Sequence, residues 1–310
     1  MSANASARSL GTAALGAGGL GVGCLAYGGL YEARAFVLRR VTVPVLPAAA
    51  TPIRVLQVSD LHLTPRSRAR QQWVAGLAAL EPDLVVDTGD NLAHPGAVPF
   101  VLRSLGRLLE VPGVYVWGSN DYYAPGFKNP LAYLAGPSRA PRPAQRSLPW
   151  RDLDAGFRRA GWVDLTHQRT TVTVCGVRLG LRGTDDAHLG RDRYAEVAGP
   201  VDRDAVDVSL AVTHAPYLGL LDAMAADGHD LILAGHTHGG QVCVPGYGAL
   251  VTNCDLDTSR VKGLSTHTAA GHTSWLHVSA GLGTSPYAPV RFACRPEATL
   301  LTLTPAAPAG

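Results

Sequence analysis

Short apolar segments that end in polar, metal-ligating side chains recur along this chain and limit its fold more than any other feature. The apolar run 53–58 leads into Ser59-Asp60-Leu61-His62, and the run 84–86 leads into Asp87-Thr88-Gly89-Asp90. Segments of helical spacing at 66–80 and 98–109 alternate with these runs, and further apolar runs lie at 114–117, 172–174, 177–181, 208–213, 231–233, 241–244, 275–278 and 298–303. Because strands that alternate with helices build layered cores, we predict an α/β fold.

The first polar motif, Asp60-Leu61-His62, places two ligand side chains on one side of an extended segment. Residues two apart in extended backbone point the same way, so Asp60 and His62 could reach one metal ion together. The same spacing occurs at Asp186 and His188, so the spacing alone does not identify a site.

Other candidate ligands follow other apolar runs. The Gly89-Asp90 turn would bring a carboxylate to the rim of the sheet, where its two oxygens could bridge two cations. His214 ends the run 208–213, and His236 and His238 lie in a glycine-rich loop after the run 231–233. Imidazole is a common ligand of transition metals, and two such side chains in a glycine frame have little use in packing. The pattern as a whole indicates a metal centre.

The order of these motifs resembles the calcineurin-like metallophosphoesterases. The stretch GHTHGGQ at 235–241, the following Val244-Pro245, GLGTS at 281–285 and Arg295-Pro296-Glu297 resemble the bacterial subgroup that carries an N-terminal membrane segment. The resemblance covers residues 51–304 and implies a four-layer αββα sandwich with two facing mixed β-sheets. It also implies two divalent metal ions, Mn, Fe or Zn, without choosing among them.

The resemblance also implies which residues bind each metal. Asp60, His62 and His238 would bind the first metal ion. Asp90 would bridge both ions, and His214 and His236 would bind the second.

One block departs from the family pattern. Relatives read Gly-Asn-His-Asp or Gly-Asn-His-Glu, where the Asn ligates the second metal and the His contacts the phosphate or leaving group, but this chain reads Gly118-Ser119-Asn120-Asp121. Aligned column by column, Ser119 replaces the ligand and Asn120 replaces the His. A shift of one residue would keep Asn120 as a ligand through its carbonyl oxygen, which we favour because an amide oxygen is the better neutral donor.

The missing His leaves the catalytic assignment open. Asp121 or His94 could stand in for it, although an ordinary surface position is the preferred interpretation of His94. The candidate catalytic residues are therefore Asp90, Asn120 and Asp121, and the candidate metal ligands are Asp60, His62, Asp90, Asn120, His214, His236 and His238. Substrate-binding residues are not assigned.

The resemblance implies an enzyme, a metallophosphoesterase that hydrolyses a phosphoester or pyrophosphate bond by a binuclear centre that activates a bridging water. The implied substrate is a phosphorylated small molecule or a lipid-linked phosphate near a membrane, as in hydrolases of UDP-diacylglucosamine. The alternatives are a metal-binding module with weak or no turnover and a nuclease or phosphodiesterase. A net charge of +3 and an aromatic content of 6% argue against a nucleic-acid partner.

The N-terminal region carries no charge from residue 10 to residue 31, a length that would span a bilayer as a helix. We predict a membrane anchor or signal within residues 1–40, a Pro/Ala-rich linker at 41–52, the metallophosphoesterase domain at 53–304 and a tail at 305–310. Arg34, Arg39 and Arg40 outnumber Arg8 on the other side of the run, which favours a membrane-associated protein with its body on the cytoplasmic side over an exported one. The proline-rich stretch 124–150 is either a substrate-facing lid or a solvated insertion.

Overall fold

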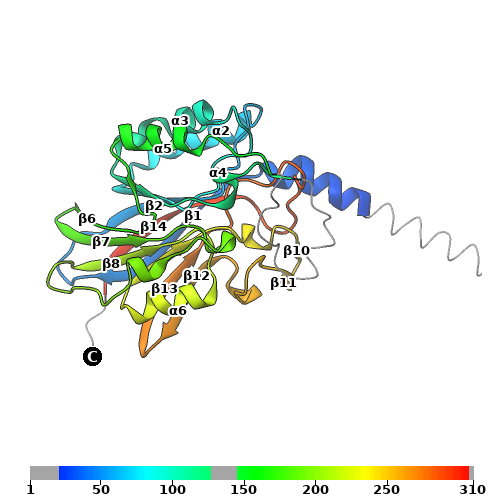
Figure 1. Cartoon of the computed structure of the whole chain (residues 1–310). Helices are drawn as coiled ribbons and strands as arrows, with labels where there is room; N and C mark the ends of the chain where they lie inside the picture. Colours follow the sequence, from blue (N-terminus) through cyan, green and yellow to red (C-terminus); the bar gives the residue numbers. More distant parts are fainter. Residues whose placement is uncertain (1–20, 127–144, 307–310) are drawn as a thin grey trace, which may run out of the picture.

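Two mixed β-sheets form the centre of the computed structural model, which describes residues 21–126 and 145–306 (Figure 1). The first sheet has the strand order β1-β14-β2-β3-β4-β5 and the second has the order β12-β13-β9-β8-β7-β6. The strands of the first sheet are β1 (Val37–Leu46), β2 (Ile53–Val58), β3 (Leu84–Asp87), β4 (Gly113–Tyr115), β5 (Val163–Asp164) and β14 (Glu297–Pro305). The strands of the second sheet are β6 (Gln168–Val174), β7 (Val177–Gly183), β8 (Val208–Val212), β9 (Leu231–Ala234), β12 (Gly263–Ala269) and β13 (His272–Val278).

Parallel strands lie at the centre of both sheets. In the first sheet β2, β3, β4 and β5 run parallel to one another, and β14 is antiparallel to β2. In the second sheet β7, β8, β9 and β13 run parallel, with β6 and β12 antiparallel at the two edges. The loops after the parallel strands of one sheet therefore emerge at the same edge of that sheet.

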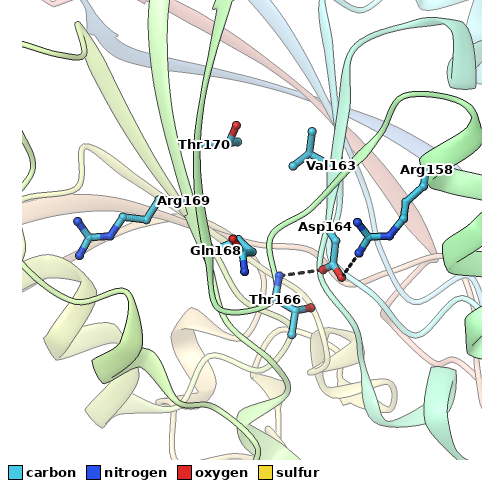
Figure 2. A pocket seen from close by; sticks show the side chains of 7 residues that line it. All are labelled: Arg158, Val163, Asp164, Thr166, Gln168, Arg169 and Thr170. Atoms are coloured by element: carbon cyan, nitrogen blue, oxygen red, sulfur yellow. Dashed lines mark hydrogen bonds and ion pairs between the residues drawn. The ribbon is translucent and has the colours of Figure 1, made fainter.

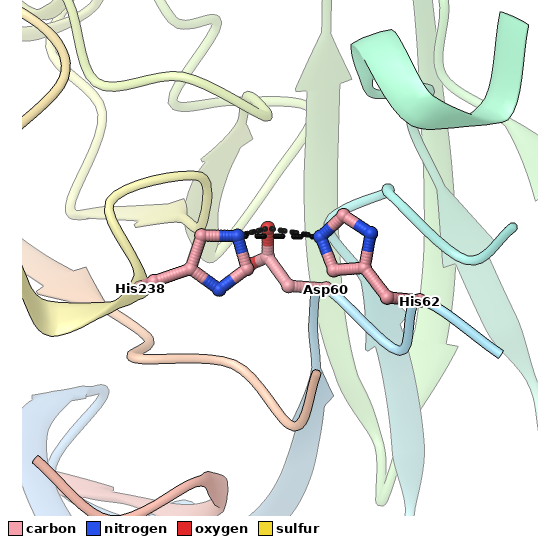
Figure 3. A group of neighbouring side chains, drawn as sticks. All are labelled: Asp60, His62 and His238. Atoms are coloured by element: carbon pink, nitrogen blue, oxygen red, sulfur yellow. Dashed lines mark hydrogen bonds and ion pairs between the residues drawn. The ribbon is translucent and has the colours of Figure 1, made fainter. Parts of the chain in front are cut away.

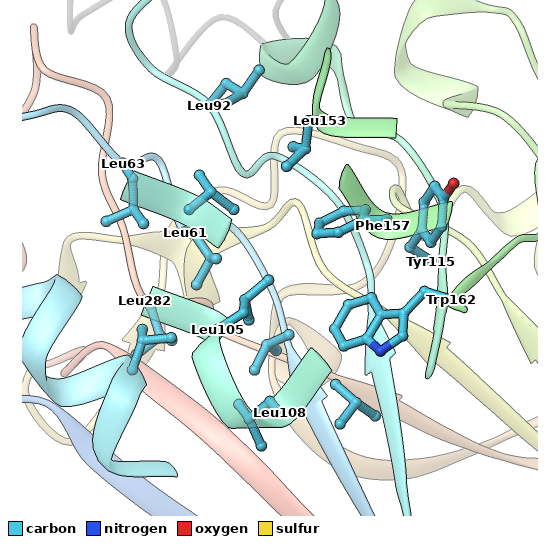
Figure 4. Packing of buried hydrophobic residues seen from close by; sticks show 14 of the residues in the cluster. Leu61, Leu63, Leu92, Leu105, Leu108, Tyr115, Leu153, Phe157, Trp162 and Leu282 are labelled. Carbon is cyan, nitrogen blue, oxygen red and sulfur yellow. The ribbon is translucent and has the colours of Figure 1, made fainter. Parts of the chain in front are cut away.

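Side chains alternate between the two faces of each strand, and this alternation builds the layers. Val55 of β2 and Val86 of β3 pack between the sheets with Leu210 of β8 and Leu233 of β9. The intervening residues of the first sheet, such as Val85, face the helices α2 (Arg68–Gly76), α3 (Val98–Leu105) and α5 (Trp150–Arg159). Figure 4 shows part of this cluster, in which Leu105, Phe157 and Trp162 pack with Tyr115 of β4.

The outer face of the second sheet is covered by α6 (Leu218–Ala226). Leu221 and Met224 of this helix pack against Ile232 of β9 and Leu276 of β13. The order helices, sheet, sheet, helix is visible in Figure 1. The predicted αββα sandwich with two facing mixed sheets is confirmed. Two short elements near the candidate site are α4 (Ser119–Tyr122) and the hairpin of β10 (Cys243–Val244) and β11 (Gly248–Ala249).

Residues 41–46, which we predicted as part of a linker, lie instead in strand β1. This strand pairs in parallel with β14, and Val43 and Leu46 are buried between the sheets. Pro44 suggested a linker, but β1 is the edge strand of its sheet, a position where a missing N–H is tolerated. The alternation of apolar residues at 41, 43 and 45 was the signal that the prolines obscured.

The predicted membrane segment at 10–31 lies partly outside the described residues, which begin at residue 21. No helix within the described part of the chain has the length and apolar character needed to cross a membrane. Residues 21–26 are α-helical and continue into the turns η1 (Tyr27–Tyr31) and η2 (Glu32–Arg34). The buried Glu32 carboxylate accepts hydrogen bonds from the N–H groups of Ala293 at 3.1 Å and Cys294 at 2.6 Å, which fastens this segment to the body.

Most of the proline-rich stretch 124–150 also lies outside the residues that the structure describes. Residues 127–144, which include Lys128, Arg139 and Arg142, are not among the described residues, and neither are residues 307–310 of the tail. Tyr123 and Ser147 form an isolated bridge on either side of the gap. The lid therefore stays a prediction.

Candidate metal centre

The predicted ligands lie in loops that follow parallel strands of both sheets. Asp60 and His62 follow β2, and Asp90 follows β3 in the first sheet. In the second sheet His214 follows β8, and His236 and His238 follow β9. Loops at the carboxyl ends of parallel strands are the usual place for sites in such sheets, and here the two facing sheets bring both sets together.

Asp60, His62 and His238 form the first group of ligand atoms (Figure 3). The Nε2 atoms of His62 and His238 are 3.2 Å apart, and they lie 4.0 and 3.7 Å from Oδ1 of Asp60. This Asp60 oxygen is buried and has no hydrogen-bond partner among the described residues. Two imidazole nitrogens and an unpaired carboxylate oxygen directed at one point are suited to a divalent transition metal.

Asp90 joins this first group to a second one. Its Oδ2 lies 3.5 Å from Nε2 of His62, and its Oδ1 lies 3.6 Å from Nε2 of His214. The Nδ1 atom of His236 is 3.3 Å from the same His214 nitrogen. The second group therefore consists of His214 and His236, which lie beside Asp90. The side chains of Asp60, Asp90 and His214 are also close enough to hold a metal together. The two oxygens of Asp90 therefore face two different sets of imidazoles.

Neighbouring groups orient the ligands. The Nδ1 atom of His214 lies 2.7 Å from the carbonyl oxygen of Thr88, which fixes the proton on Nδ1 and leaves Nε2 as the ligand atom. The fully buried Arg291 guanidinium donates to the carbonyl oxygens of Ala280 and Gly283, both at 2.7 Å, and to that of His238 at 3.3 Å. One side chain thus connects the His238 loop with the loop at 280–283.

Five of the candidate ligands are held in an uncommon backbone conformation. Asp60, His62, Asp90, His236 and His238 all have positive φ, between 40° and 70°. Such a conformation is rare outside glycine and costs of order 1–3 kcal/mol for each residue, so it persists where the surroundings enforce it. Its concentration at these ligands is typical of a functional site.

Close approach explains two glycines at the site. A Cβ atom at Gly118 would collide with Oδ1 of Asp90 and would lie 2.6 Å from Cε1 of His214. A Cβ atom at Gly235 would collide with Oγ of Ser59 and would lie 2.8 Å from Oδ2 of Asp60. The ligands therefore pack directly against the backbone of these loops.

Burial keeps three of the imidazoles neutral. It lowers the pKa of His62 to about 4 and holds the pKa values of His236 and His238 well below the usual range. Neutral imidazole is the form that binds metal. Burial also raises the pKa of the Asp60 carboxyl group to about 6.

His214 and Asp90 shift in the opposite sense because they face each other. Burial would lower the pKa of His214, but the carboxylates of Asp90, Asp186 and Asp60 outweigh it and raise that pKa to about 9. Burial would raise the pKa of Asp90, but His214 and His62 outweigh it and hold that pKa below its usual value. The centre therefore favours a positive charge between its carboxylates.

Comparison with known proteins agrees with this geometry. The family model described as calcineurin-like phosphoesterase matches residues 53–240, the range that contains every predicted ligand. The chain belongs to this family. It is a metallophosphoesterase, as the resemblance implied.

Several relatives of this metallophosphoesterase are similar over most of their length. The uncharacterized protein YpbG of Bacillus subtilis is 27% identical over 256 residues, 81% of each chain. Phosphodiesterase YaeI of Escherichia coli is 28% identical over 260 residues, 82% of this chain and 83% of that protein. A 5'-nucleotidase precursor from Thermus thermophilus is a solved structure with 14% identity and a TM-score of 0.42, covering 81% of this chain and 55% of that one.

The block that departs from the family pattern lies against Asp90. The side-chain nitrogen Nδ2 of Asn120 donates to Oδ2 of Asp90 at 2.7 Å, and the Asn120 backbone N–H donates to Oδ1 at 2.7 Å. We predicted that Asn120 presents its carbonyl oxygen to a metal. In the structure its amide nitrogen donates to Asp90, a contact that favours a role in holding this carboxylate, and the ligand role stays a prediction.

Asp121 and His94 differ in how they relate to the ligands. The buried Asp121 carboxylate accepts hydrogen bonds from the N–H groups of Asp90, Asn91 and Gly118 at 2.8 to 3.0 Å. His94 is exposed, and its Nδ1 accepts from the N–H of Gly96 in a local turn. These contacts favour a positioning role for Asp121 over the catalytic role that we predicted from the sequence.

Two parts of the site were missed from the sequence. The Asp186-x-His188 motif, left unassigned, lies beside the second group, since the ring centroids of His188 and His236 are 4.5 Å apart. Arg291 carries no motif of its own. A basic residue between the GLGTS and Arg-Pro-Glu motifs was the signal that could have indicated it.

A separate hollow lies between β5 and β6, where the edges of the two sheets meet (Figure 2). It contains the ion pair of Arg158 and Asp164, 2.9 Å apart. Its lining residues are Arg158, Val163, Asp164, Thr166, Gln168, Arg169 and Thr170. None of the candidate ligands lines it, so it is distinct from the metal centre.

Proposed function

We propose that this protein hydrolyses a phosphodiester or pyrophosphate bond with two divalent cations bound at the sheet edges. The observation that carries the proposal is Asp90, whose two oxygens face His62 at 3.5 Å and His214 at 3.6 Å. A carboxylate placed between two sets of imidazoles is the arrangement expected of a bridging ligand in a two-metal site.

The residues fit such a pair of cations. Asp60, His62 and His238 would hold the first cation, His214 and His236 the second, and Asp90 both. Bound cations would lower the pKa of a water molecule and neutralise the phosphoryl oxygens. Asn120 and Asp121 keep Asp90 in place through its side chain and its backbone. The name of the Escherichia coli relative, a phosphodiesterase, supports a diester substrate over a monoester.

We further propose that the substrate is lipid-linked and that the site works beside a membrane. The support is an apolar rim of exposed side chains in two stretches: Val22, Leu25, Tyr27, Leu30 and Tyr31, and Val242, Val244, Tyr247, Leu250 and Tyr287. Exposed apolar side chains that gather at one end of a molecule favour an interaction site there, and tyrosine suits the boundary between lipid and water. Both stretches lie at one end of the molecule (Figure 1).

Contacts join the two stretches of the apolar rim to each other and to the metal centre. The ring of Tyr27 packs edge to face on Phe292 at 5.9 Å, and Phe292 pairs with Val242. Gly28 accepts a hydrogen bond from the N–H of Arg291, whose side chain holds the His238 loop. A lipid surface at the apolar rim would therefore place headgroups near the ligands.

The first experiment tests hydrolysis. The full chain is freed of metal, reloaded with Mn²⁺ and assayed on bis-p-nitrophenyl phosphate and p-nitrophenyl phosphate. We expect metal-dependent turnover with the diester preferred. Asp90→Asn should abolish it, whereas Asp207→Asn, the same change in a surface ion pair with Arg178, should retain it. A folded, metal-loaded protein without turnover on either ester would refute the hydrolase proposal and favour a metal-binding module.

The second experiment tests the lipid-linked substrate. The double variant Tyr247→Ser, Leu250→Ser is compared with the original chain on p-nitrophenyl hexadecyl phosphate in phosphatidylglycerol vesicles and on bis-p-nitrophenyl phosphate in solution. We expect a loss on the vesicle substrate alone. Thr268→Ala in the β12–β13 hairpin should change neither rate. Equal rates of the double variant and the original chain on vesicles would contradict a lipid contact at the apolar rim.

A further inference from the structure

His188 lies beside the second group of ligands but comes from a loop that the ligand motifs do not include. This loop follows β7 and contains the turn η6 (Ala187–Leu189). The His188 ring is tilted by 43° against that of His236, with the centroids 4.5 Å apart. His214 and His236 are buried, whereas His188 is only half-buried. His188 is therefore the imidazole next to this group that a substrate can reach.

Two neighbours hold the ring in this position. The Asp186 carboxylate accepts the backbone N–H of His188 at 2.8 Å, which caps the turn η6. The Tyr217 hydroxyl lies 3.1 Å from Nδ1 of His188, and the two rings stack with 30° between their planes. Since Nδ1 faces this hydroxyl, Nε2 is the ring nitrogen whose N–H would donate to a substrate.

The loop that carries His188 is tied to the block that departs from the family pattern. The hydroxyl of Tyr122, the last residue of α4, donates to Oδ1 of Asp185 at 2.8 Å. The other oxygen of Asp185 accepts from Nε of Arg191 at 2.9 Å, and this guanidinium lies 4.0 Å from the centre of the Tyr122 ring. Residues 119–122 and 185–191 therefore form one unit around the second group.

A phosphate at this site needs directional donors that face it. The two proposed cations would offset the buried carboxylates of Asp60, Asp90 and Asp186, but an N–H donor also fixes the orientation of a phosphoryl oxygen. Arg291 directs its guanidinium at backbone carbonyls and at Nδ1 of His238, a residue of the first group. Hydrogen bonds to a charged phosphate are stronger than those between neutral groups, so one well-placed N–H contributes measurably to binding.

We propose that His188 is a substrate-binding residue that donates a hydrogen bond from Nε2 of its imidazole to a phosphoryl oxygen. This inference rests on the proposed function. It assigns the phosphate contact of this site to the β7 loop, with Asp186 and Tyr217 as positioning residues, and it involves no proton transfer. His188 is in neither group of metal-ligating side chains found among the described residues.

The experiment compares His188→Ala and His188→Gln in the full chain. The readouts are the Kd of inorganic phosphate for the Mn²⁺-loaded protein by calorimetry, the metal content, the Tm, and kcat/KM on bis-p-nitrophenyl phosphate. We expect His188→Ala to weaken phosphate binding by roughly 10- to 100-fold with metal content unchanged. His188→Gln, which keeps an N–H donor, should recover part of that loss. His94→Ala, an exposed imidazole in a local turn, is the matched control and should bind phosphate normally.

The outcomes separate this inference from the proposed function. Unchanged phosphate affinity in His188→Ala, with the original chain active, would overturn the role of His188 alone. Loss of metal in His188→Ala would assign His188 to the metal instead. If the Ala variant does not fold, Tyr217→Phe serves as the second test, since loss of the hydroxyl should weaken phosphate binding while the imidazole remains. An original chain that neither hydrolyses the diester nor binds phosphate would refute the proposed function itself.

Discussion

The carboxylate of Asp121 accepts hydrogen bonds from the backbone N–H groups of Asp90 and Asn91, both at 2.8 Å, and of Gly118 at 3.0 Å. Through them it connects the loop after β3 to the loop after β4. The side chain acts as an acceptor toward all three donors, so it stabilises the turn that presents Asp90. This is the physical reason to regard Asp121 as a positioning residue.

We expect Asp121→Asn to lower stability by about 1–3 kcal/mol, because the amide keeps one acceptor oxygen but turns an NH₂ group toward an N–H donor. Activity should fall by the same factor on bis-p-nitrophenyl phosphate and on a dialkyl phosphate, whose leaving group is an alcohol. Urea unfolding and steady-state kinetics provide the measurement. A much larger loss with the alkyl leaving group would instead identify Asp121 as the acid that the sequence suggested.

Substituting Gly118 should damage the site without a change of charge. In Gly118→Ala the new Cβ would collide with Oδ1 of Asp90 and press on His214, so the Asp90 carboxylate must shift. We expect kcat/KM to fall by roughly 100-fold, as is typical when catalytic groups are misplaced by about 1 Å. Gly219→Ala in α6, where nothing lies within 4 Å of the new Cβ, is the control and should leave kcat/KM unchanged. Equal activity of the two variants would show that Asp90 tolerates displacement.

Metal affinity should depend on pH in a way set by His214 and Asp60. The pKa of His214 is raised to about 9, so below pH 9 a cation at the second position must displace a proton. Affinity there should therefore rise about tenfold per pH unit as pH increases from 6 to 9. The Asp60 carboxyl group, with a pKa of about 6, adds a further loss at the first position below that pH. Titration of Mn²⁺ against a competing chelator measures both, and a flat response from pH 6 to 9 would contradict the raised pKa of His214.

The N-terminal strand should be essential to the fold. A chain that begins at Thr51 lacks β1, which removes the buried Val43 and Leu46 and uncovers the edge of β14. Each of these side chains contributes roughly 1.5–3 kcal/mol when fully buried. We expect a large drop in the melting temperature relative to a chain that begins at Gly21, which keeps Glu32 and its two hydrogen bonds. Identical melting temperatures of the two chains would show that β1 contributes nothing to stability, as expected of a linker.

Much of the fold could be predicted from the sequence because it depends on local pattern. The apolar run at 53–58 matches β2, and the run at 84–86 falls within β3. β1 was missed because Pro44 and Pro47 suggest a linker, and its strand character depends on pairing with β14 at the far end of the chain. α5 was missed because it follows a proline-rich stretch that hides its helical spacing.

The sequence by itself determined the family and the order of the ligand motifs, because a ligand that follows a strand is a local property of the chain. Only the tertiary structure decided between two motifs of the same spacing. Asp60 and His62 meet His238 in the first group. Asp186 instead caps the turn that carries His188, and Tyr217 contacts the His188 ring beside the second group. It also decided that Asp121 positions Asp90 and that Arg291 links two loops. The physical reason is that spacing places ligand side chains near one another along the chain, while loop conformation and the pairing of distant strands fix what each side chain meets.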